Sequence, residues 1–571
     1  MNGPGDRATK SSSKGKPTLF CQAEGHDAAP KTRADMERAF PPGSESSARS
    51  EMSPAREPGD LGGASAPVVG ARHSREGQEP QAVRKASEES DEAIVPGKLA
   101  KTRVTPVESV EGRAEAKGKP AARNASPTQG GSDATTWLRR IGERAKERKE
   151  ERFTNLLSHV KVPLLEEAYR RLRRNAAAGV DAMTWKEYGR RLRERLLDLQ
   201  DRVHRGSYHP LPVRRVHIPK GNGKTRPLGI PALEDKLLQQ AVRMVLEPIY
   251  EAQFVGFSYG FRPGRSPHAA LDALALAVGR KVSWVLDADI RSFFDTIDHG
   301  WMQRFIEHRI GDRRLVRLLM RWLKAGVMED GELRGTEAGT PQGGIISPLL
   351  ANIYLHYAFD LWVQAWRKAS SHGEVYVVRY ADDLVMGFQK EEDARAMRTA
   401  LAERFAKFGL ELHPEKTRVI RFGRYAREDC GRDGLRKPAT FDFLGFTHIC
   451  SVDRTRGWFQ LRRRTSRKKR LAKLVSLREE MRCRRHEPMK AQHLWLSSVL
   501  LGHYRYYGVP TNYSALSAFR SEVEQSWHCS LQRRSQRAKW SPDRRAAVQR
   551  RFPLPKPRIQ HPWPNQRLAI R

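Results

Sequence analysis

The spacing of apolar residues changes several times along the chain, and these changes predict where helices and strands lie. Residues 137–174 are dense in good helix formers and carry apolar residues at every third or fourth position, so helices are expected there. Strands are predicted at 213–219 and 282–288, and further helices at 235–250, 266–280 and, as a pair, 301–325. Strands and helices are therefore interleaved through this part of the chain.

The second half of the sequence contains more strand patterns and then becomes helical. Residues 374–388 are two apolar stretches around a turn with two aspartates, and residues 441–449 have another strand pattern. Strands are expected to end at about residue 460, because 462–540 is mostly helical in pattern and studded with arginine. Residues 541–571 are Pro-rich and basic. This order of elements predicts an α+β fold.

Residues 1–132 differ from everything that follows them. They are rich in Gly, Pro, Ala and Ser, and they show no sustained period of two or 3.6 residues, which predicts a disordered extension. Their twenty Lys or Arg and eighteen Asp or Glu give a net charge of +2, so +36 of the chain's +38 belongs to the other residues. A near-neutral extension is expected to be a tether or a dispensable segment rather than the main binding element.

The composition adds a partner class and a compartment. Among 571 residues, 104 Lys and Arg against 66 Asp and Glu indicate a polyanionic partner. The five cysteines lie far apart without any Cys-x-x-Cys, which favours neither a disulfide framework nor a structural zinc site and fits a reducing cytosol. No stretch reads as a signal peptide or a membrane span, so we expect a cytoplasmic protein with no membrane partner.

The strongest candidate for chemistry is a set of three aspartates. Asp382 and Asp383 occupy the turn of the apolar hairpin at 374–388, and Asp289 follows the strand predicted at 282–288. Two aspartates in a hairpin turn are usually ordinary turn residues. If the two strands are neighbours, however, the three carboxylates converge and form a site for hard divalent cations, which support in-line phosphoryl transfer.

Eight motifs occur in an order that resembles the group II intron-encoded reverse transcriptases and maturases. The resemblance spans residues 140–560 and rests on RNAAAGVDAMTW (174–185), IPKGNGKTRPLGIP (218–231), SYGFRPGRSPHAAL (258–271), DADIRSFFDTIDH (287–299), GTPQGGIISPLLANIYLH (339–356), RYADDLVMGF (379–388), LHPEKT (412–417) and FDFLGF (441–446). Ala182 departs from the glycine that is common in the first of these motifs.

The resemblance implies a right-hand polymerase with four segments. Residues 133–455 would form the fingers and palm, 456–540 a helical thumb and maturase domain, and 541–571 a basic Pro-rich tail, preceded by the extension at 1–132. Many relatives end in an HNH-type endonuclease with paired Cys-x-x-Cys motifs, which this sequence lacks, so we expect an enzyme that does not itself cut the second target strand.

The resemblance also assigns roles at the active site. Asp289, Asp382 and Asp383 would hold two Mg²⁺ ions, and Phe294 would be the aromatic gate that excludes a 2′-hydroxyl and favours deoxynucleotides. Four further residues are implied at the nucleotide: Lys220 and Arg226 at the triphosphate, Gln342 near the ribose, and Lys416 assisting departure of pyrophosphate. Without the motifs, Phe294 would be a core aromatic and Gln342 a turn residue. Lys220 and Arg226 would be part of an exposed basic hairpin, and Lys416 would be a solvated lysine at a helix end.

The C-terminal helical region combines cations with aromatic residues, which suits RNA. The candidates for phosphate contacts and base stacking are Arg462, Arg463, Arg464, Arg467, Lys468, Lys469, Arg470, Tyr504, Tyr506 and Tyr507. A helical core with a solvated basic face explains the same composition. The stretch GHYRYYGVPTN (502–512) resembles the maturase domain, which favours RNA binding.

The sequence therefore predicts an RNA-directed DNA polymerase that also binds its intron RNA and assists splicing and retrohoming. Its expected partners are the intron RNA, a DNA target or primer, and deoxynucleoside triphosphates. Two alternatives stay open. One is a maturase-only RNA-binding protein in which the polymerase fold is a scaffold. The other is a domesticated reverse transcriptase of a retron, a diversity-generating element or a defence system.

Overall fold

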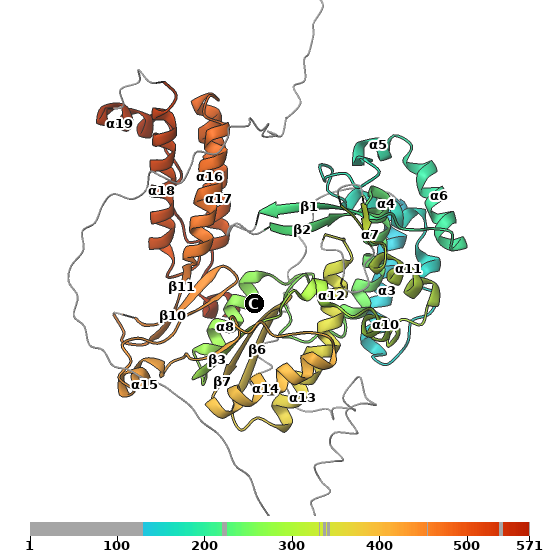
Figure 1. The fold of residues 1–571 in the computed structure, drawn as a ribbon, viewed down its shortest axis with the longest axis horizontal. Coiled ribbons are helices and arrows are strands. Elements are labelled where there is room, and N and C mark those ends of the chain that lie inside the picture. The colour runs from blue at the N-terminus through green and yellow to red at the C-terminus, as the bar shows by residue number, and fades with distance from the viewer. Residues whose placement is uncertain are drawn as a thin grey trace, which may run out of the picture. The chain divides into compact units, whose positions relative to one another are not determined.

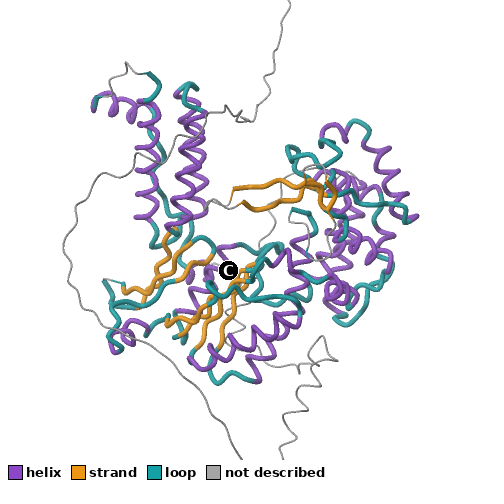
Figure 2. The backbone as a smooth tube through the Cα atoms, in the orientation of Figure 1, coloured by secondary structure: helices purple, strands orange, loops and turns teal. Residues whose placement is uncertain are grey.

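The computed structural model describes residues 129–219, 225–329, 332–334, 339, 343–453, 455–535 and 541–569 (Figure 1). The disordered extension expected at 1–132 lies almost entirely outside the described residues. The described chain contains helices and three separate β-sheets, which Figure 2 shows in orange. Within these ranges no helix is both long and apolar enough to cross a membrane.

The first part of the described chain is mostly helical and includes a four-stranded sheet of order β2-β1-β4-β5. Its elements are α3 (Gln129–Glu147), the short 3₁₀ helix Leu157–His159, α4 (Val162–Arg171), α5 (Trp185–Gly189), α6 (Leu192–Arg205), β1 (Val213–Pro219), β2 (Thr225–Ile230), α7 (Leu233–Glu251), α10 (His299–Glu307), α11 (Arg313–Leu323), β4 (Val327–Glu329) and β5 (Glu332–Arg334). Helix α7 is buried on most of its surface, so it forms the centre of this part.

A second four-stranded sheet, of order β6-β7-β3-β8, is called here the central sheet. It comprises β3 (Trp284–Asp289), β6 (Val375–Tyr380), β7 (Asp383–Phe388) and β8 (Arg418–Arg421), and the helices nearby are α8 (Pro267–Val278), α9 (Phe293–Thr296), α12 (Ser347–Leu355), the π-helical turn His356–Asp360, α13 (Leu361–Ala369), α14 (Glu391–Lys407) and α15 (Ala426–Arg432). Alternate residues of the strands face opposite sides, since Val285 packs with the core under α8 and Leu286 with the core that contains α14. Helices therefore cover both faces of the sheet.

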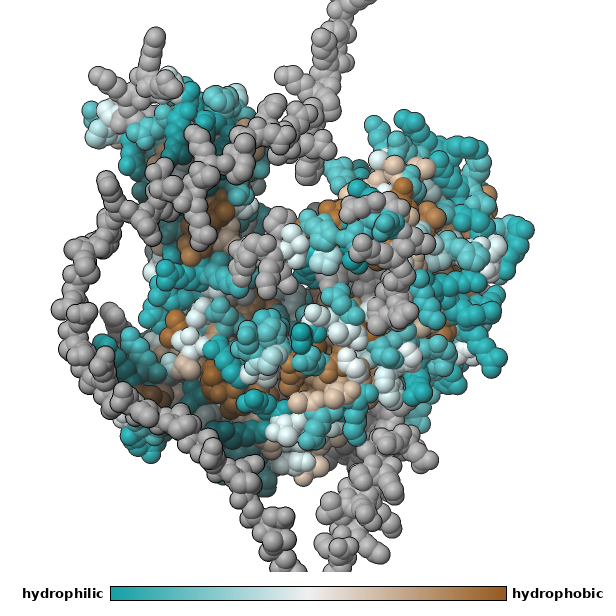
Figure 3. Space-filling model, viewed as in Figure 1, coloured by the Kyte–Doolittle hydropathy of each residue, from teal (hydrophilic) through white to brown (hydrophobic). Residues whose placement is uncertain are grey.

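The remaining elements form a three-stranded sheet and a helical bundle. They are β9 (Phe441–Phe443), β10 (Phe446–Val452), β11 (Phe459–Thr465), α16 (Arg467–Cys483), α17 (Met489–Tyr507), α18 (Tyr513–Gln532), α19 (Pro542–Arg551) and α20 (Pro564–Ala569). Helices α16, α17 and α18 stand side by side and share an apolar core that includes Leu477, Leu500 and Phe519 (Figure 1). The visible outer surfaces of this bundle and of α5 and α6 are mostly hydrophilic (Figure 3).

Two sequence expectations in this region are wrong. The single strand expected at 441–449 is a hairpin, because Leu444 and Gly445 have φ of +49° and +80° and reverse the chain between β9 and β10. Strands also continue past residue 460, since β11 ends at Thr465 and the helices begin at Arg467. The arginine-rich stretch 462–465 has the pattern of a helix, but cross-strand pairing with β10 holds it extended.

His448 on β10 is a titratable group in an apolar setting. It is fully buried, pairs across the sheet with Phe441 and Arg463, and its ring stacks on Phe441 at 4.8 Å between centroids. Burial lowers the pKa of His448 to about 3, and the charge of Arg463 acts in the same direction, against a main-chain hydrogen bond at Phe443. The imidazole is therefore neutral in the folded protein throughout the physiological range.

Because the folded-state pKa of His448 lies below its unfolded value of about 6.5, its contribution to stability is present above that value and is lost as the pH falls towards 3. Between pH 7 and pH 5 the loss is about 2 kcal/mol. We expect His448→Phe to remove this part of the pH dependence, as measured by urea unfolding at the two pH values. The exposed His209→Gln is the control, and an equal pH dependence in His448→Phe and wild type would contradict the prediction.

Candidate active site

Strand pairing gathers the three aspartates at one end of the central sheet. Asp289, the last residue of β3, lies directly opposite Asp383, the first residue of β7. Asp382 lies in the two-residue turn between β6 and β7, next to Ala381, whose φ is +57°. Directly opposed residues in an antiparallel pair have Cβ atoms about 4.5–5.5 Å apart and point to the same face. The register therefore places Asp289 and Asp383 side by side, with Asp382 in the adjoining turn.

The proximity of these carboxylates changes their acidity. Burial, followed by the negative charges of Asp382, Asp289 and Asp287, raises the pKa of Asp383 to about 7. Burial and Asp289 also raise the pKa of Asp382, against the opposing charge of Arg226. Ionising all of these groups together is unfavourable unless positive charge is nearby, so the cluster has the electrostatics of a cation site.

Asp287 is a fourth carboxylate that the sequence analysis did not single out. It lies two residues before Asp289 on β3, so both side chains are on one face of the strand. Burial raises the pKa of Asp287 to about 6, although Arg418, at 3.5 Å, acts in the opposite direction. The available signal was the Asp-x-Asp alternation at 287–289, at the end of the predicted strand.

The segment after α14 brings a lysine to the cluster. The backbone N–H of His413 donates to the carbonyl oxygen of Asp289 at 2.8 Å, and Leu412 forms a β-bridge with Ile290. These contacts hold the turn that carries Lys416, whose ammonium forms an ion pair with the Asp289 carboxylate. Lys416 is therefore at the aspartates and not at a helix end.

A buried arginine supports the turn that carries Asp382. Arg379 is fully buried and donates to both carboxylate oxygens of Asp360, at 2.7 and 2.5 Å, and to the carbonyl oxygen of Ala381 at 3.2 Å. It also donates to Asn352 Oδ1 at 2.9 Å and to Ser258 Oγ at 2.7 Å. Burial acts to raise the pKa of Asp360, but the charge and hydrogen bonds of Arg379, with His356 nearby, outweigh it, so the pKa lies below its usual value.

The backbone of the turn also packs against a glycine. A Cβ on Gly260 would lie 2.3 Å from the backbone nitrogen of Ala381, so no larger residue fits while the turn keeps its position. Asn352 Nδ2 holds the glycine from the other side by donating to its carbonyl oxygen at 2.7 Å. The position of the turn is thus determined by close contacts with two distant parts of the sequence, residues 258–260 and 352–360.

Comparisons with known proteins agree with this geometry. A family model described as reverse transcriptase (RNA-dependent DNA polymerase) matches residues 218–448, which include the central sheet and all three aspartates. The chain is 40% identical over 239 residues to Protein YkfC of Escherichia coli (strain K12), and 41% identical over 221 residues to the group II intron-encoded protein LtrA of Lactococcus lactis subsp. cremoris. It is 31% identical over 181 residues to nuclear intron maturase 3, mitochondrial, of Arabidopsis thaliana.

Over its reverse transcriptase domain the chain is similar to a group II intron-encoded protein and to an intron maturase. The matches cover 36%, 38% and 28% of this chain and 62%, 37% and 25% of those relatives, so the chain spans less than two thirds of their length. A reverse transcriptase domain implies the right-hand polymerase fold, and the mixed helix and sheet architecture agrees with it.

Reverse transcriptases generally use divalent metal ions, typically Mg²⁺. The carboxylate oxygens of Asp289, Asp382 and Asp383 are the donors that Mg²⁺ prefers, and the raised pKa values show that a cation would relieve their repulsion. The donor set therefore fits such an ion in its chemistry. Within the described ranges, no three His, Cys, Asp or Glu side chains are already arranged as a cluster able to hold a metal ion.

The structure describes three of the five residues that the sequence predicts at the nucleotide. Lys220 and Gln342 lie outside the described residues. Phe294 is partly exposed on α9, beside the buried Phe293, and Arg226 on β2 is close enough to Asp382 to lower its pKa. Phe294 therefore packs on the core beside Phe293 and also keeps part of its surface exposed.

Two of the residues predicted to bind RNA are buried, and the prediction is wrong for both. Arg463 is 3% exposed and forms an ion pair with Asp272 of α8 at 3.0 Å, so its charge is used within the protein. Tyr504 is 1% exposed in the bundle core and donates to the carbonyl oxygen of Pro555 at 3.0 Å, so its ring cannot stack on a base. Both are core residues because their helix and strand pack on neighbouring elements.

The other predicted RNA contacts divide into two groups. Tyr506 and Tyr507 are half-buried: Tyr506 donates to the carbonyl oxygen of Leu444 at 2.9 Å, and both rings pack on Phe446. Arg470 forms an ion pair with Glu522 at 3.2 Å. The exposed or half-exposed cations are Arg462, Arg464, Arg467, Lys468 and Lys469. The charge of Lys469 reaches Asp383, which places the first turn of α16 near the aspartates.

Replacing Arg379 with Met should be strongly destabilising, because it leaves Asp360 buried without a partner. We expect a loss of about 3–5 kcal/mol in the free energy of unfolding. The control is Arg395→Met, which removes an exposed pair with Glu391 and should cost about 0.5 kcal/mol or less. Urea unfolding of both variants tests this, and similar losses in the two would contradict the structural role of Arg379.

Asp383→Asn should stabilise the protein at alkaline pH. A carboxyl group whose folded pKa is raised contributes stability below its unfolded pKa and loses it as the pH rises through the folded value, here about 7. The side chain retains contact with solvent, so we expect a gain of about 1 kcal/mol at pH 8 without divalent ions, and less at pH 5. Thermal unfolding with and without Mg²⁺ measures it, because the ion should stabilise wild type more than the variant. Asp433→Asn is the exposed control.

Proposed function

We propose that this protein is an RNA-directed DNA polymerase that also binds intron RNA and assists its splicing and retrohoming. The observation that carries the polymerase proposal is the register of the central sheet, in which Asp289 faces Asp383 beside the turn that holds Asp382. In this proposal the central sheet belongs to the palm, the sheet that contains β1 and β2 to the fingers, and α16–α18 to the thumb and maturase domain.

Asp289, Asp382 and Asp383 are proposed to hold two Mg²⁺ ions. When bound, the ions would supply activation of the primer hydroxyl and stabilisation of the charge on the departing pyrophosphate. The protein's own contribution is to keep the carboxylates together against their repulsion, which the contacts of Arg379 and Gly260 with the turn support. Preorganised charge of this kind costs no rearrangement during the reaction.

The nucleotide is proposed to lie between these aspartates and the side chains of Phe294, Arg226 and Lys416. The ring of Phe294 is exposed enough to contact a sugar, and a flat aromatic surface there would leave no room for a 2′-hydroxyl. Arg226 and Lys416 act on the charges of Asp382 and Asp289, respectively, and are suited to neutralise phosphate oxygens. Lys220 and Gln342 keep their proposed roles at the triphosphate and the ribose.

Binding of intron RNA is proposed to use the cations at the start of the helical bundle. The members of this basic group are Arg462, Arg464, Arg467, Lys468 and Lys469, with Arg470 and the half-buried Tyr506 and Tyr507 at its margin. The group lies on β11 and the first turn of α16, and the exposed members present charge to solvent. Phosphate contacts of this kind make affinity fall steeply as salt rises.

Primer extension on an RNA template with deoxynucleotides and Mg²⁺ tests the polymerase proposal. Asp289→Asn and Asp382→Asn should each reduce DNA synthesis by at least about 100-fold, since each removes a charged ligand at the reacting centre. The matched control is Glu411→Gln, an exposed carboxylate near the site that pairs with Arg291 at 3.1 Å and should retain activity.

Binding of structured intron RNA should be measured on the same proteins. Loss of synthesis with retained RNA binding in the aspartate variants supports two functions on one chain. A wild-type protein that makes no DNA while binding the RNA tightly would instead favour the maturase-only alternative. Synthesis that is unchanged in both aspartate variants would contradict the proposed site.

A further inference from the structure

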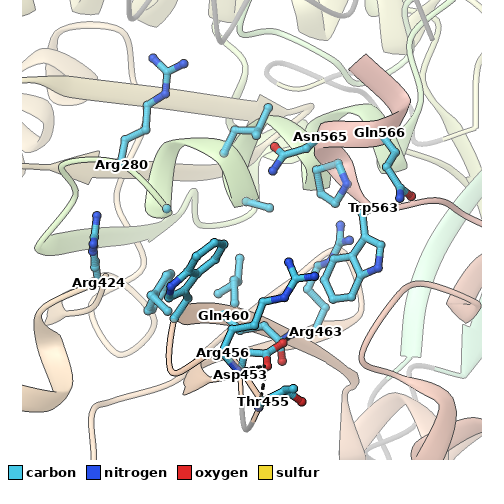
Figure 4. A pocket seen from close by; sticks show the side chains of 17 residues that line it. Arg280, Arg424, Asp453, Thr455, Arg456, Gln460, Arg463, Trp563, Asn565 and Gln566 are labelled. Carbon is cyan, nitrogen blue, oxygen red and sulfur yellow. Dashed lines mark hydrogen bonds between the residues drawn. The ribbon is translucent and has the colours of Figure 1, made fainter. Parts of the chain in front are cut away.

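A cavity of about 1040 Å³ lies away from the aspartates. Its walls come from the end of α8, the loop after β8, the turn between β10 and β11, and the segment that leads into α20 (Figure 4). The cavity lies near the start of β3, because Arg424 follows β8 and Arg421 of β8 is the strand partner of Trp284, the first residue of β3. Asp289 is at the other end of β3. Five residues of strand separate these ends by about 17 Å. The cavity is therefore distinct from the proposed polymerase site.

Two tryptophans line the cavity and are exposed. Trp458 is 69% exposed, the largest value among the large apolar side chains of the described residues, and Trp563 is 42% exposed. The guanidinium of Arg456 lies over Trp458, 5.7 Å from the ring centroid. Indole rings left in water beside arginine offer flat surfaces on which planar, negatively charged ligands can stack.

The charge of the lining is strongly positive. It contains four arginines and one carboxylate, Asp453, whose Oδ1 accepts the backbone N–H groups of Thr455 and Arg456 at 2.9 and 3.1 Å. Arg463 is neutralised by Asp272. In the part of the chain that the structure describes, the remaining three arginines are not within ion-pair distance of a carboxylate, and they are Arg280, Arg424 and Arg456.

The lining residues surround one space. In Figure 4, Arg280 and Arg424 lie on the left, whereas Arg456, Arg463, Trp563 and Asn565 lie across from them. The volume is at the upper limit of about 1,000 Å³ for small-ligand pockets, which leaves room for a segment of a longer molecule. The cavity has cations on both sides, and its two aromatic rings come from segments far apart in sequence. Sites that bind single-stranded nucleic acid combine the same two kinds of residue.

We propose that this cavity binds an unpaired stretch of polynucleotide, with bases stacked on Trp458 and Trp563 and phosphates at Arg280, Arg424 and Arg456. A peptide of Asp and Glu would use the arginines but has no aromatic ring to stack on two exposed indoles, whereas every nucleotide has both a phosphate and an aromatic base. The proposal does not depend on polymerase activity. A second contact on the same chain would hold a long RNA at high effective concentration near the active site.

The experiment measures binding of fluorescein-labelled twelve-nucleotide oligouridylate to the full chain by anisotropy, with the oligodeoxythymidylate of equal length as a second probe. An excess of unlabelled RNA–DNA duplex occupies the proposed polymerase site. Trp458→Ala with Trp563→Ala should weaken binding by roughly 10- to 100-fold. Trp458→Phe with Trp563→Phe should restore most of it, because phenyl rings still stack. Arg424→Ala with Arg456→Ala should reduce the slope of log Kd against log salt by about 1.4.

The matched control is Trp495→Ala, which removes a bundle tryptophan that Arg484 covers, outside the cavity. It should bind both probes as wild type does, and circular dichroism of every variant verifies folding. Equal losses for both probes assign the cavity to RNA and DNA alike, and a loss for RNA alone assigns it to RNA. Wild-type affinity in the folded double tryptophan variant would overturn the proposal. The proposal would also be overturned if wild type bound labelled oligoglutamate tightly and the double tryptophan variant lost this binding but kept its affinity for RNA.

Discussion

The buried ion pair between Arg379 and Asp360 is the interaction on which the rest of the site depends. Its guanidinium satisfies Asp360, Asn352, Ser258 and the carbonyl oxygen of Ala381 at once, and so joins β6, two helical segments and the turn that carries Asp382. A charge at zero exposure is tolerated only when its donors are paired, which means that the surrounding elements can adopt few other arrangements. The polar network therefore determines where the aspartates are held, in a way that apolar packing alone would not.

The aspartates themselves oppose folding. Burial and mutual repulsion raise the pKa values of Asp382, Asp383 and Asp287, so the ionised cluster is a region of stored electrostatic strain. Lys416 offsets part of this at Asp289. Such a cluster is expected where a protein must bind a cation or a group that develops charge, and the stability that it costs has to come from elsewhere. The two apolar cores on either side of the central sheet supply that stability.

The distribution of arginine and aromatic residues shows how little composition alone determines a binding surface. Arg463 and Tyr504 have the chemistry of RNA ligands but serve the internal packing of β11 and α17, whereas Trp458 and Trp563 are exposed beside arginines that form no ion pair within the described part of the chain. What distinguishes them is the face on which each residue lies. The same residue types stabilise the fold when they point inward, and they offer planar or charged surfaces when they point outward.

The sequence by itself determined the order of elements, the two-aspartate turn at 382–383 and the resemblance to a family, because hydrophobic period and motif order are local properties. It also anticipated that Asp289 would meet that turn. Only the tertiary structure decided that the stretch at 441–449 is a hairpin, that Arg463 is buried against Asp272, and that Asp287 belongs to the carboxylate cluster. These features depend on pairing register and on contacts between residues nearly two hundred positions apart, as between Asp272 and Arg463, 191 residues apart. A one-dimensional pattern contains no information about such distances until the chain has folded.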